Sequence, residues 1–432
     1  MKDNICTIAQ FTTGGSHILS GYRSPFVAEC VQKLEDAGAV VSQKTELDEF
    51  GMGSNSTNTA FGSVSNVYAD DISAGGSSGG SAVAVASQAC FAALGTDTGG
   101  SVRLPAAYNG VVGFKPSYGA ISRWGVISYA NSLDTVGILA KSVGDVATVF
   151  AAMKGKVSSD PTYLTYEERH SQERRKYRIG VPLESNTPEL SPLMRKAWSQ
   201  TLSCLLSAGH SLHTVSLPNT PSALSAYYVL APAEASSNLA KYDGARYGKH
   251  SKAPRAAGQV LYAQTRGQLL GEEVRRRILL GTFSLSAGAM DNYYLQAQKV
   301  RRLVQQDFDR IFDAPNPLIK QAGTKDASFR ERVDVIVMPT SQSLPPKLED
   351  LRQGKGDAAS EYAGDVLTVP ASLAGLPAIS VPVEIPGEFK AEAGPVQAVG
   401  MQLVGQIGCD TEVLRTAEEV ERICGLRRAG AQ

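Results

Sequence analysis

Two clusters of glycine and serine carry the residues of this chain that could do chemistry. They read GGSSGGS at 75–81 and GTDTGGS at 95–101, and an apolar, alanine-rich run separates them at 82–94. That run contains no glycine or proline, which predicts a buried helix leading into a short strand. Glycines at the ends of such elements let successive backbone N–H groups converge and hold an anion or an oxyanion. A serine at such a point is a candidate nucleophile.

Three known uses of such clusters compete. A flexible linker fits poorly, because linkers do not flank an apolar helix and a strand so closely. A nucleotide-binding loop needs G-x-x-x-x-G-K-[ST] or G-x-G-x-x-G, and neither spacing occurs here. A nucleophile elbow would use Ser77 in G-x-S-x-G and would need an aspartate and then a histidine downstream. None of the five histidines stands at a strand end beside an obvious acidic partner: His17, His170, His210, His213 and His250.

A lysine offers a different base. Its amine can take the proton of a serine hydroxyl when burial keeps the amine neutral. The run at 75–117 resembles the signature of the amidase signature family of Ser-cisSer-Lys hydrolases, and the opening KDNI resembles the segment that carries the lysine of that family. The separations also agree with the family pattern, with 75 residues from Lys2 to Ser77 and 24 from Ser77 to Ser101.

The resemblance implies a role for each matching residue. Ser101 is expected to be the nucleophile, and Lys2 the general base. Ser77 is expected to follow a cis peptide bond and to bridge the other two by hydrogen bonds. The implied oxyanion hole consists of backbone N–H groups of Thr98, Gly99, Gly100 and Ser101. Ser78 and Asp97 are candidates for supporting hydrogen bonds.

Further segments narrow the resemblance to one branch of the family. They include KTELDEFGMGSNS, AYYVLAPAEASSNLAKYDGARYG, EEVRRRILLGTFSLSAG and DVLTVPASLAGLPAISVPV, and they are similar to glutamine-hydrolysing subunits of tRNA-dependent amidotransferases. This implies that Arg277 binds the glutamine carboxylate, that Asp365 binds its ammonium group, and that Tyr227 contacts the substrate. A guanidinium can grip a carboxylate through two parallel bonds. Judged by residue type alone, Arg277 could be solvated, Asp365 a helix cap and Tyr227 a core residue.

The resemblance also implies partners. Such a glutaminase needs no metal or cofactor of its own, because ATP and magnesium belong to a second amidotransferase subunit that receives the ammonia. A small third subunit and a charged tRNA, reached through the complex, complete the assembly. The balance of 42 basic against 42 acidic residues fits this division, since nothing in it indicates binding to nucleic acid or membrane. Six scattered cysteines with no C-x-x-C pair indicate a reducing compartment and no zinc site.

The elements that position these residues follow a β-α-β alternation. This alternation and the resemblance together predict an α/β fold with a large mixed, mainly parallel sheet covered by helices on both faces. We expect a single domain over 1–432, with a signature core at about 73–117. A helical region at about 221–305 is expected to shape the substrate pocket, and a polar stretch at about 314–332 to form a loop insertion.

Two expectations concern the start of the chain and its location. Lys2 stands one residue from the start, whereas the family has several tens of residues before its lysine. We therefore expect a truncated form or a base held poorly at a fraying end. The insertion resembles those of fungal mitochondrial proteins, which favours the mitochondrial matrix over the cytoplasm. Two other functions stay open: a stand-alone amidase acting on another small amide, and a catalytically impaired assembly subunit.

Overall fold

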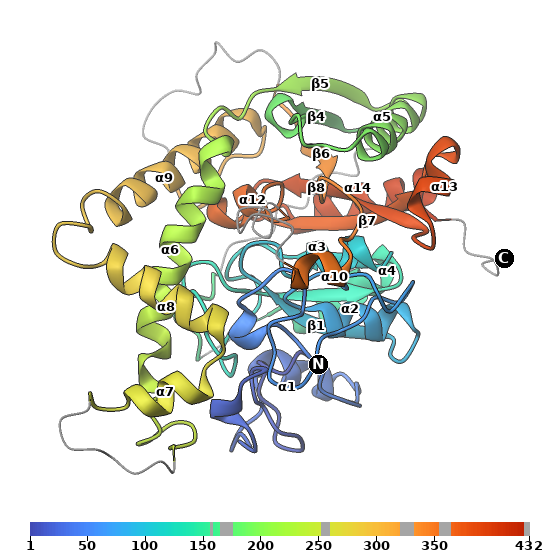
Figure 1. Cartoon of the computed structure of the whole chain (residues 1–432). Coiled ribbons are helices and arrows are strands. Elements are labelled where there is room, and N and C mark those ends of the chain that lie inside the picture. The colour runs from blue at the N-terminus through green and yellow to red at the C-terminus, as the bar shows by residue number, and fades with distance from the viewer. Residues whose placement is uncertain (156–158, 165–175, 252–259, 320–331, 354–363, 427–432) are drawn as a thin grey trace.

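A mixed eight-stranded sheet forms the centre of the described part of the chain (Figure 1). A computed structural model describes residues 1–155, 159–164, 176–251, 260–319, 332–353 and 364–426. The strands lie in the order β1-β3-β2-β7-β8-β6-β4-β5. They are β1 (Ala92–Asp97), β2 (Val112–Lys115), β3 (Thr135–Ala140), β4 (Arg178–Pro182), β5 (Ser211–Val215), β6 (Val335–Pro339), β7 (Ala378–Glu384) and β8 (Ala398–Gly405). Strands β2, β3, β6 and β8 are buried along their whole length, so the core lies on both faces of the sheet.

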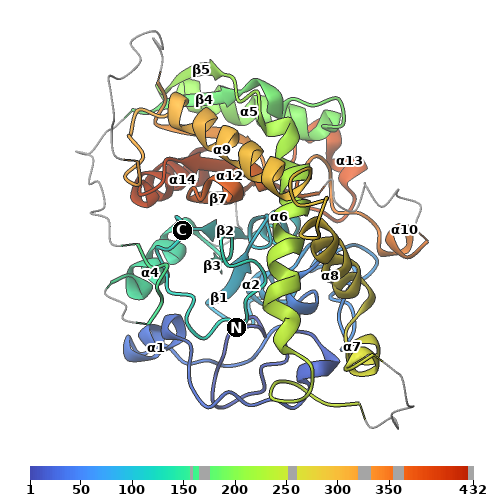
Figure 2. The same ribbon diagram turned by 90° about the vertical axis from the view of Figure 1, so that its left-hand side faces the viewer.

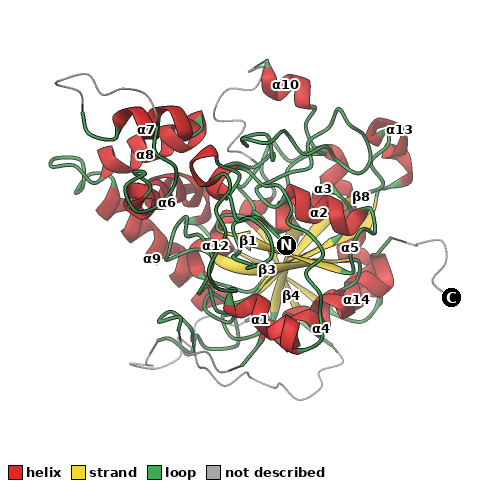
Figure 3. Ribbon diagram, turned by 90° about the horizontal axis from the view of Figure 1, so that it is seen from below, coloured by secondary structure: helices red, strands yellow, loops and turns green. Residues whose placement is uncertain are grey.

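Helices cover both faces, as predicted. Those described are α1 (Glu29–Asp36), α2 (Gly79–Ala86), α3 (Arg103–Tyr108), α4 (Val143–Met153), α5 (Pro192–Ser207), α6 (Ala223–Asn238), α7 (Ala263–Leu269), α8 (Glu272–Ser284), α9 (Tyr294–Ile311), α10 (Leu348–Arg352), α12 (Val369–Ala374), α13 (Lys390–Ala393) and α14 (Asp410–Cys424). Helices α2 and α3 pack on one face, and α4, α5 and α14 on the other (Figure 3). Within the described ranges, no helix combines the length and the apolar character that crossing a bilayer requires.

The prediction of a mainly parallel sheet was wrong. Among the described strands, only β4 pairs in parallel, with β5 and with β6, and every other pairing is antiparallel. The antiparallel pairs arise because an antiparallel strand lies between two strands that run in the same direction. Strands β1 and β2 run in the same direction, as expected for strands joined through α3, but β3 lies between them and is antiparallel to both. Strand β8 separates β6 from β7 in the same way.

A helical block flanks the sheet on one side. The range 221–305 holds α6, α7, α8 and most of α9, and α6 packs against both α8 and α9 (Figure 2). Helices α6 and α8 touch through Gly281, where an added Cβ would lie 1.9 Å from the carbonyl oxygen of Pro232. Only glycine allows that approach, which brings the side chain of Arg277, one turn earlier on α8, into the interior.

The predicted loop insertion falls partly outside the described residues. Residues 314–319 form turns and irregular backbone, and 320–331 are not described.

Candidate active site

Lys2 lies at the centre of a buried polar cluster. Its Nζ is 2.7 Å from Ser77 Oγ, 2.8 Å from Ser78 Oγ and 3.3 Å from the carbonyl oxygen of Thr96. The Lys2 backbone N–H donates to the carbonyl of Leu94 at 3.1 Å, and the Lys2 side chain is fully buried. The expectation of a poorly held base was therefore wrong, because backbone pairing with the adjacent strand fixes this residue.

The electrostatics of Lys2 suit a base. Burial lowers the pKa of its amine from 10.5 to about 7, although the charges of Asp48, Asp97 and Asp134 act in the opposite direction. Near pH 7 a large share of the amine is therefore neutral, and it can accept a proton from a serine hydroxyl.

A second buried lysine shows that the pKa alone does not identify the base. Burial and then the charge of Arg103 lower the pKa of Lys115 to about 7 as well. The Lys115 Nζ donates to the carbonyl of Pro116 at 2.9 Å and, among the described residues, to no serine. Contact with serine hydroxyls therefore distinguishes Lys2.

The two serine clusters meet at Ser77 and Ser101. The Gly76–Ser77 peptide bond is cis, as the sequence resemblance implies. The backbone N–H of Ser78 donates to the carbonyl of Ser101 at 3.1 Å, which joins the two loops. The expected hydrogen bond between the hydroxyls of Ser77 and Ser101 does not occur in the described part of the chain; Ser77 Oγ accepts from Lys2 instead. Catalytic hydrogen bonds often align only when substrate is bound.

Four consecutive backbone donors lie beside Ser101. The N–H groups of residues 98–101 reach no acceptor among the described residues, although all four residues are buried. Burying an N–H group without a partner is costly, so such a row favours a negatively charged oxygen. Glycine is required at two positions. A Cβ at Gly99 would lie 2.8 Å from the ring of Tyr227, and one at Gly100 would lie 2.1 Å from Thr368 Oγ1.

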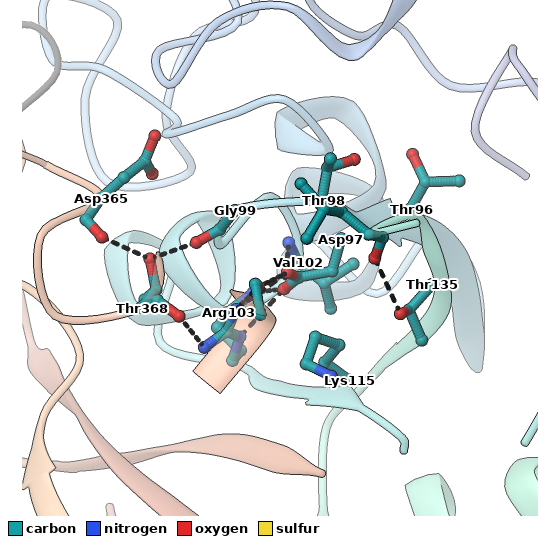
Figure 4. Close-up of polar contacts among 12 residues, drawn as sticks. Thr96, Asp97, Thr98, Gly99, Val102, Arg103, Lys115, Thr135, Asp365 and Thr368 are labelled. Atoms are coloured by element: carbon teal, nitrogen blue, oxygen red, sulfur yellow. Dashed lines mark hydrogen bonds and ion pairs between the residues drawn. The ribbon is translucent and has the colours of Figure 1, made fainter. Parts of the chain in front are cut away.

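An ion pair holds the base of this loop (Figure 4). Arg103 and Asp97 are both fully buried, and Arg103 donates from Nε and Nη2 to the two Asp97 carboxylate oxygens at 3.0 and 2.9 Å. Asp97 Oδ2 also accepts the backbone N–H of Val102 at 3.2 Å. Burial would raise the pKa of Asp97, but the charge and hydrogen bonds of Arg103 lower it overall. The residues on either side of Ser101 are thereby fixed.

The predicted substrate residues gather on the other side of the same loop. Asp365 Oδ2 accepts from Ser54 Oγ at 2.8 Å, and its Oδ1 lies 3.3 Å from where a Cβ of Gly100 would be. Arg277 is 3% exposed; its Nε donates to Glu273 Oε1 at 2.7 Å and its Nη1 to Tyr129 Oη at 2.8 Å. Tyr227 lies against Gly99 and Asp365 lies beside Gly100, so these two predicted contacts border the row of donors, whereas Arg277 is held by Glu273 and Tyr129.

Comparison with known proteins places the chain in a family. A family model described as Amidase matches residues 1–414. The chain belongs to the amidase family. It is 53% identical, over 98% of its own length and 88% of the relative, to a protein of Coccidioides posadasii named as the A subunit of mitochondrial glutamyl-tRNA(Gln) amidotransferase. A protein of the same name from Emericella nidulans is 52% identical, again over 98% and 88%.

A solved structure agrees with these relatives. The crystal structure of the corresponding glutamyl-tRNA(Gln) amidotransferase subunit from Thermotoga maritima matches 98% of this amidase and 82% of that chain, with a TM-score of 0.78 and 35% identity. The mixed α/β fold predicted from the sequence is confirmed by this likeness. With its family and relatives, the protein is an enzyme of the amidase and amidotransferase class.

The sequence did not single out two residues that complete the site of this amidase. Tyr228 links the two charged residues, because its hydroxyl donates to Asp365 Oδ2 at 3.3 Å and its ring lies 5.4 Å from the Arg277 guanidinium. Thr368 Oγ1 donates to the carbonyl of Gly99 at 2.7 Å. The sequence does offer a signal for Thr368, because this residue lies within the segment DVLTVPASLAGLPAISVPV, three residues after Asp365.

Proposed function

We propose that this chain is the glutaminase subunit of a glutamyl-tRNA(Gln) amidotransferase, hydrolysing glutamine with Lys2, Ser77 and Ser101. One observation carries the proposal. The buried contact between Lys2 and Ser77 and the buried carboxylate of Asp365 both lie beside the loop that carries the unpaired donors at 98–101, and Tyr228 links Asp365 to the Arg277 guanidinium. The Arg277 guanidinium and the Asp365 carboxylate have the charges that suit the carboxylate and the ammonium of a free amino acid. The names of the relatives support the same activity.

The proposed reaction is acyl transfer. Ser101 Oγ attacks the carbon of the side-chain amide while its proton passes through the Ser77 hydroxyl to the neutral amine of Lys2. The amide oxygen becomes an oxyanion, which accepts hydrogen bonds from the N–H groups at 98–101. Lys2 then returns a proton to the departing nitrogen, and ammonia leaves. Water, deprotonated along the same path, releases glutamate from Ser101.

The partners and location of the complex belong to the proposal. It needs no cofactor in this chain and assigns ATP and Mg²⁺ to the second amidotransferase subunit, which would receive the ammonia and hold the charged tRNA. A small third subunit completes a heterotrimer. The relatives are named as mitochondrial, which supports a location in the mitochondrion.

Ammonia release from glutamine tests the function. The chain is assayed alone, and together with the second and third subunits and charged tRNA, with Ser101→Ala as the inactive control. We expect glutamine hydrolysis that rises in the complete complex and a loss of about 10⁴-fold or more in Ser101→Ala. Faster turnover of other small amides without partners would instead favour a stand-alone amidase. Normal assembly with no ammonia release under any condition would favour an impaired assembly subunit.

A further inference from the structure

Thr368 holds the row of backbone donors from outside (Figure 4). Its Oγ1 lies 2.7 Å from the carbonyl oxygen of Gly99 and 3.1 Å from that of Asp365, and the shorter distance favours donation of its one hydroxyl proton to Gly99; the residue is fully buried. The backbone of Gly100 packs directly against this hydroxyl, since a Cβ there would lie 2.1 Å from Oγ1. Gly99, Gly100 and Thr368 are all buried, so little solvent reaches this contact.

The geometry of a peptide unit makes this contact important. The carbonyl of Gly99 and the N–H of Gly100 belong to one peptide unit, which is planar and, when trans, points its oxygen and hydrogen in opposite directions. Among the described residues, the only cis peptide bond is Gly76–Ser77. A bond that fixes the oxygen of Gly99 therefore also fixes the direction of the Gly100 N–H, away from Thr368. It also polarises that N–H and makes it a stronger donor.

Thr368 itself is held on two sides. Its carbonyl accepts from Arg103 Nη1 at 2.8 Å, and Arg103 is the partner of Asp97 at the base of the loop. Its backbone N–H donates to the carbonyl of Asp365 at 3.1 Å. As a β-branched residue it has a stiff first side-chain torsion, so its hydroxyl keeps its direction. One residue thus joins the turn that carries Asp365 to the loop that carries Ser101.

We propose that Thr368 is a positioning residue that aims the Gly100 N–H at the oxyanion and couples it to the Asp365 turn. The inference rests on the proposed function, because it assigns the donors at 98–101 to a developing oxyanion. Full negative charge on that oxygen exists only in the transition state and the intermediate. Loss of the Thr368 hydroxyl therefore reduces kcat far more than it weakens glutamine binding.

Two substitutions at this position separate the hydroxyl from the shape of the side chain. Thr368→Val keeps the branched shape and removes the donor, whereas Thr368→Ser keeps the donor. We expect Thr368→Val to lower kcat for glutamine by about 10- to 100-fold with KM changed less than about threefold. Thr368→Ser should restore kcat to within about threefold of wild type. Thr201→Val is the matched control, because Thr201 is buried and donates to a carbonyl within α5, remote from the site, at 2.9 Å; its kinetics should equal wild type.

A second measurement separates failure of this inference from failure of the proposed function. A fluorophosphonate labels an activated serine without needing the glutamine pocket, and its phosphoryl oxygen requires the same donors; Ser101→Ala is the blank. If wild type does not hydrolyse glutamine but Thr368→Val is labelled about tenfold more slowly than Thr368→Ser, the proposed function fails and the positioning role holds. If Thr368→Val matches wild type in hydrolysis and labelling, or raises only KM, the positioning role is wrong. Should Thr368→Val fail to fold by circular dichroism, Thr368→Ala removes the same donor without adding bulk.

Discussion

At the scale of the residue, the proposed chemistry depends on two ionisations inside the pocket. Burial lowers the pKa of Lys2 to about 7 and raises that of Asp365 to about 6. Lys2 must be neutral to accept a proton, and Asp365 must be charged to bind an ammonium group. We expect kcat/KM for glutamine to fall about tenfold per unit below pH 7, and more steeply below pH 6. A profile of kcat/KM against pH measures both changes of slope.

Two variants test whether Lys2 causes the fall in kcat/KM that begins near pH 7. Lys2→Arg keeps a permanent positive charge and should lower kcat by about 10³-fold at pH 8, with a smaller loss relative to wild type below pH 7, where the wild-type amine is itself protonated. Lys115→Met removes the second buried lysine whose pKa is lowered to about 7, and it should leave the fall in kcat/KM near pH 7 unchanged. The role of Lys2 would be contradicted by a profile that stays flat between pH 5.5 and 8. It would also be contradicted if the fall in kcat/KM near pH 7 disappeared in Lys115→Met.

Single residues differ in how far the sequence could predict them. Lys2, Ser77 and Ser101 stand in motifs whose spacing is fixed, and the structure brings Lys2 within hydrogen-bonding distance of Ser77. Tyr227 and Tyr228 are adjacent on α6, and their side chains therefore point about 100° apart on the helix. No local pattern shows which ring meets Gly99 and which meets Asp365. That choice depends on how α6 is turned against the loop.

At the scale of the element, the sequence predicted the α/β class but not how the strands pair. The chain passes from β3 into α4 within three residues, with no proline at the boundary, so the strand has no clear local stop signal. Its partners are set by contacts far along the chain, and the paired residues of β1 lie 38 to 48 positions earlier. Alternation of strands and helices therefore predicted a mainly parallel sheet, because it gives no signal for β3, which lies between β1 and β2 and is antiparallel to both.

Strand β3 also supports the loop that carries Ser101, through a glycine. Gly137 pairs with Gly95 on β1, and a Cβ at Gly137 would lie 2.8 Å from both the carbonyl oxygen of Phe114 and the side chain of Val102. We expect Gly137→Ala to lower the free energy of unfolding by about 1–3 kcal/mol, because backbone must move to admit the methyl group. It should also lower kcat, because Val102 follows Ser101.

Denaturation in urea, followed by tryptophan fluorescence, measures the effect of Gly137→Ala. Gly144→Ala on α4 is the matched control, because the nearest atom to its added Cβ is 3.9 Å away and alanine favours helix. Its stability should equal or slightly exceed that of wild type. Equal stabilities for the two variants would show that the contact of Gly137 with Phe114 and Val102 tolerates a side chain.

At the scale of the whole molecule, the site is assembled from segments that are remote in sequence, so contacts between these segments must hold it together. Glu49 makes one such contact, which we call the Glu49 joint. It is 4% exposed and accepts hydrogen bonds from Ser16 Oγ and, at 2.7 Å, from the N–H of Gly271, the residue before α8. Through this carboxylate the N-terminal loops hold the helix that carries Arg277. A Cβ at Gly271 would lie 2.2 Å from Glu49 Oε2, so the joint also requires glycine.

This joint makes the stability of the molecule depend on pH. Burial raises the pKa of Glu49 from 4.5 to about 7. Below pH 4.5 the carboxyl is protonated in both folded and unfolded states. Between pH 4.5 and 7 only the unfolded state releases the proton, so the free energy of unfolding falls by about 1.4 kcal/mol per pH unit from this group alone, and above pH 7 the loss is constant. Glu49→Gln cannot ionise, yet its amide oxygen can still accept from Gly271.

We therefore expect Glu49→Gln to be increasingly more stable than wild type as the pH rises from 4.5 to 7, with a constant difference above pH 7. Thermal unfolding of both proteins at pH 5, 6, 7 and 8 measures this as a growing difference in Tm. Glu272→Gln is the control, because that carboxylate lies on α8 with its side chain 82% exposed and its removal should leave Tm unchanged. A Tm difference that is the same at every pH would show that Glu49 is not held in this buried contact. If the difference grows while KM for glutamine stays near that of wild type, the neutral joint is sufficient to hold Arg277, and the charge on Glu49 serves neither folding nor substrate binding.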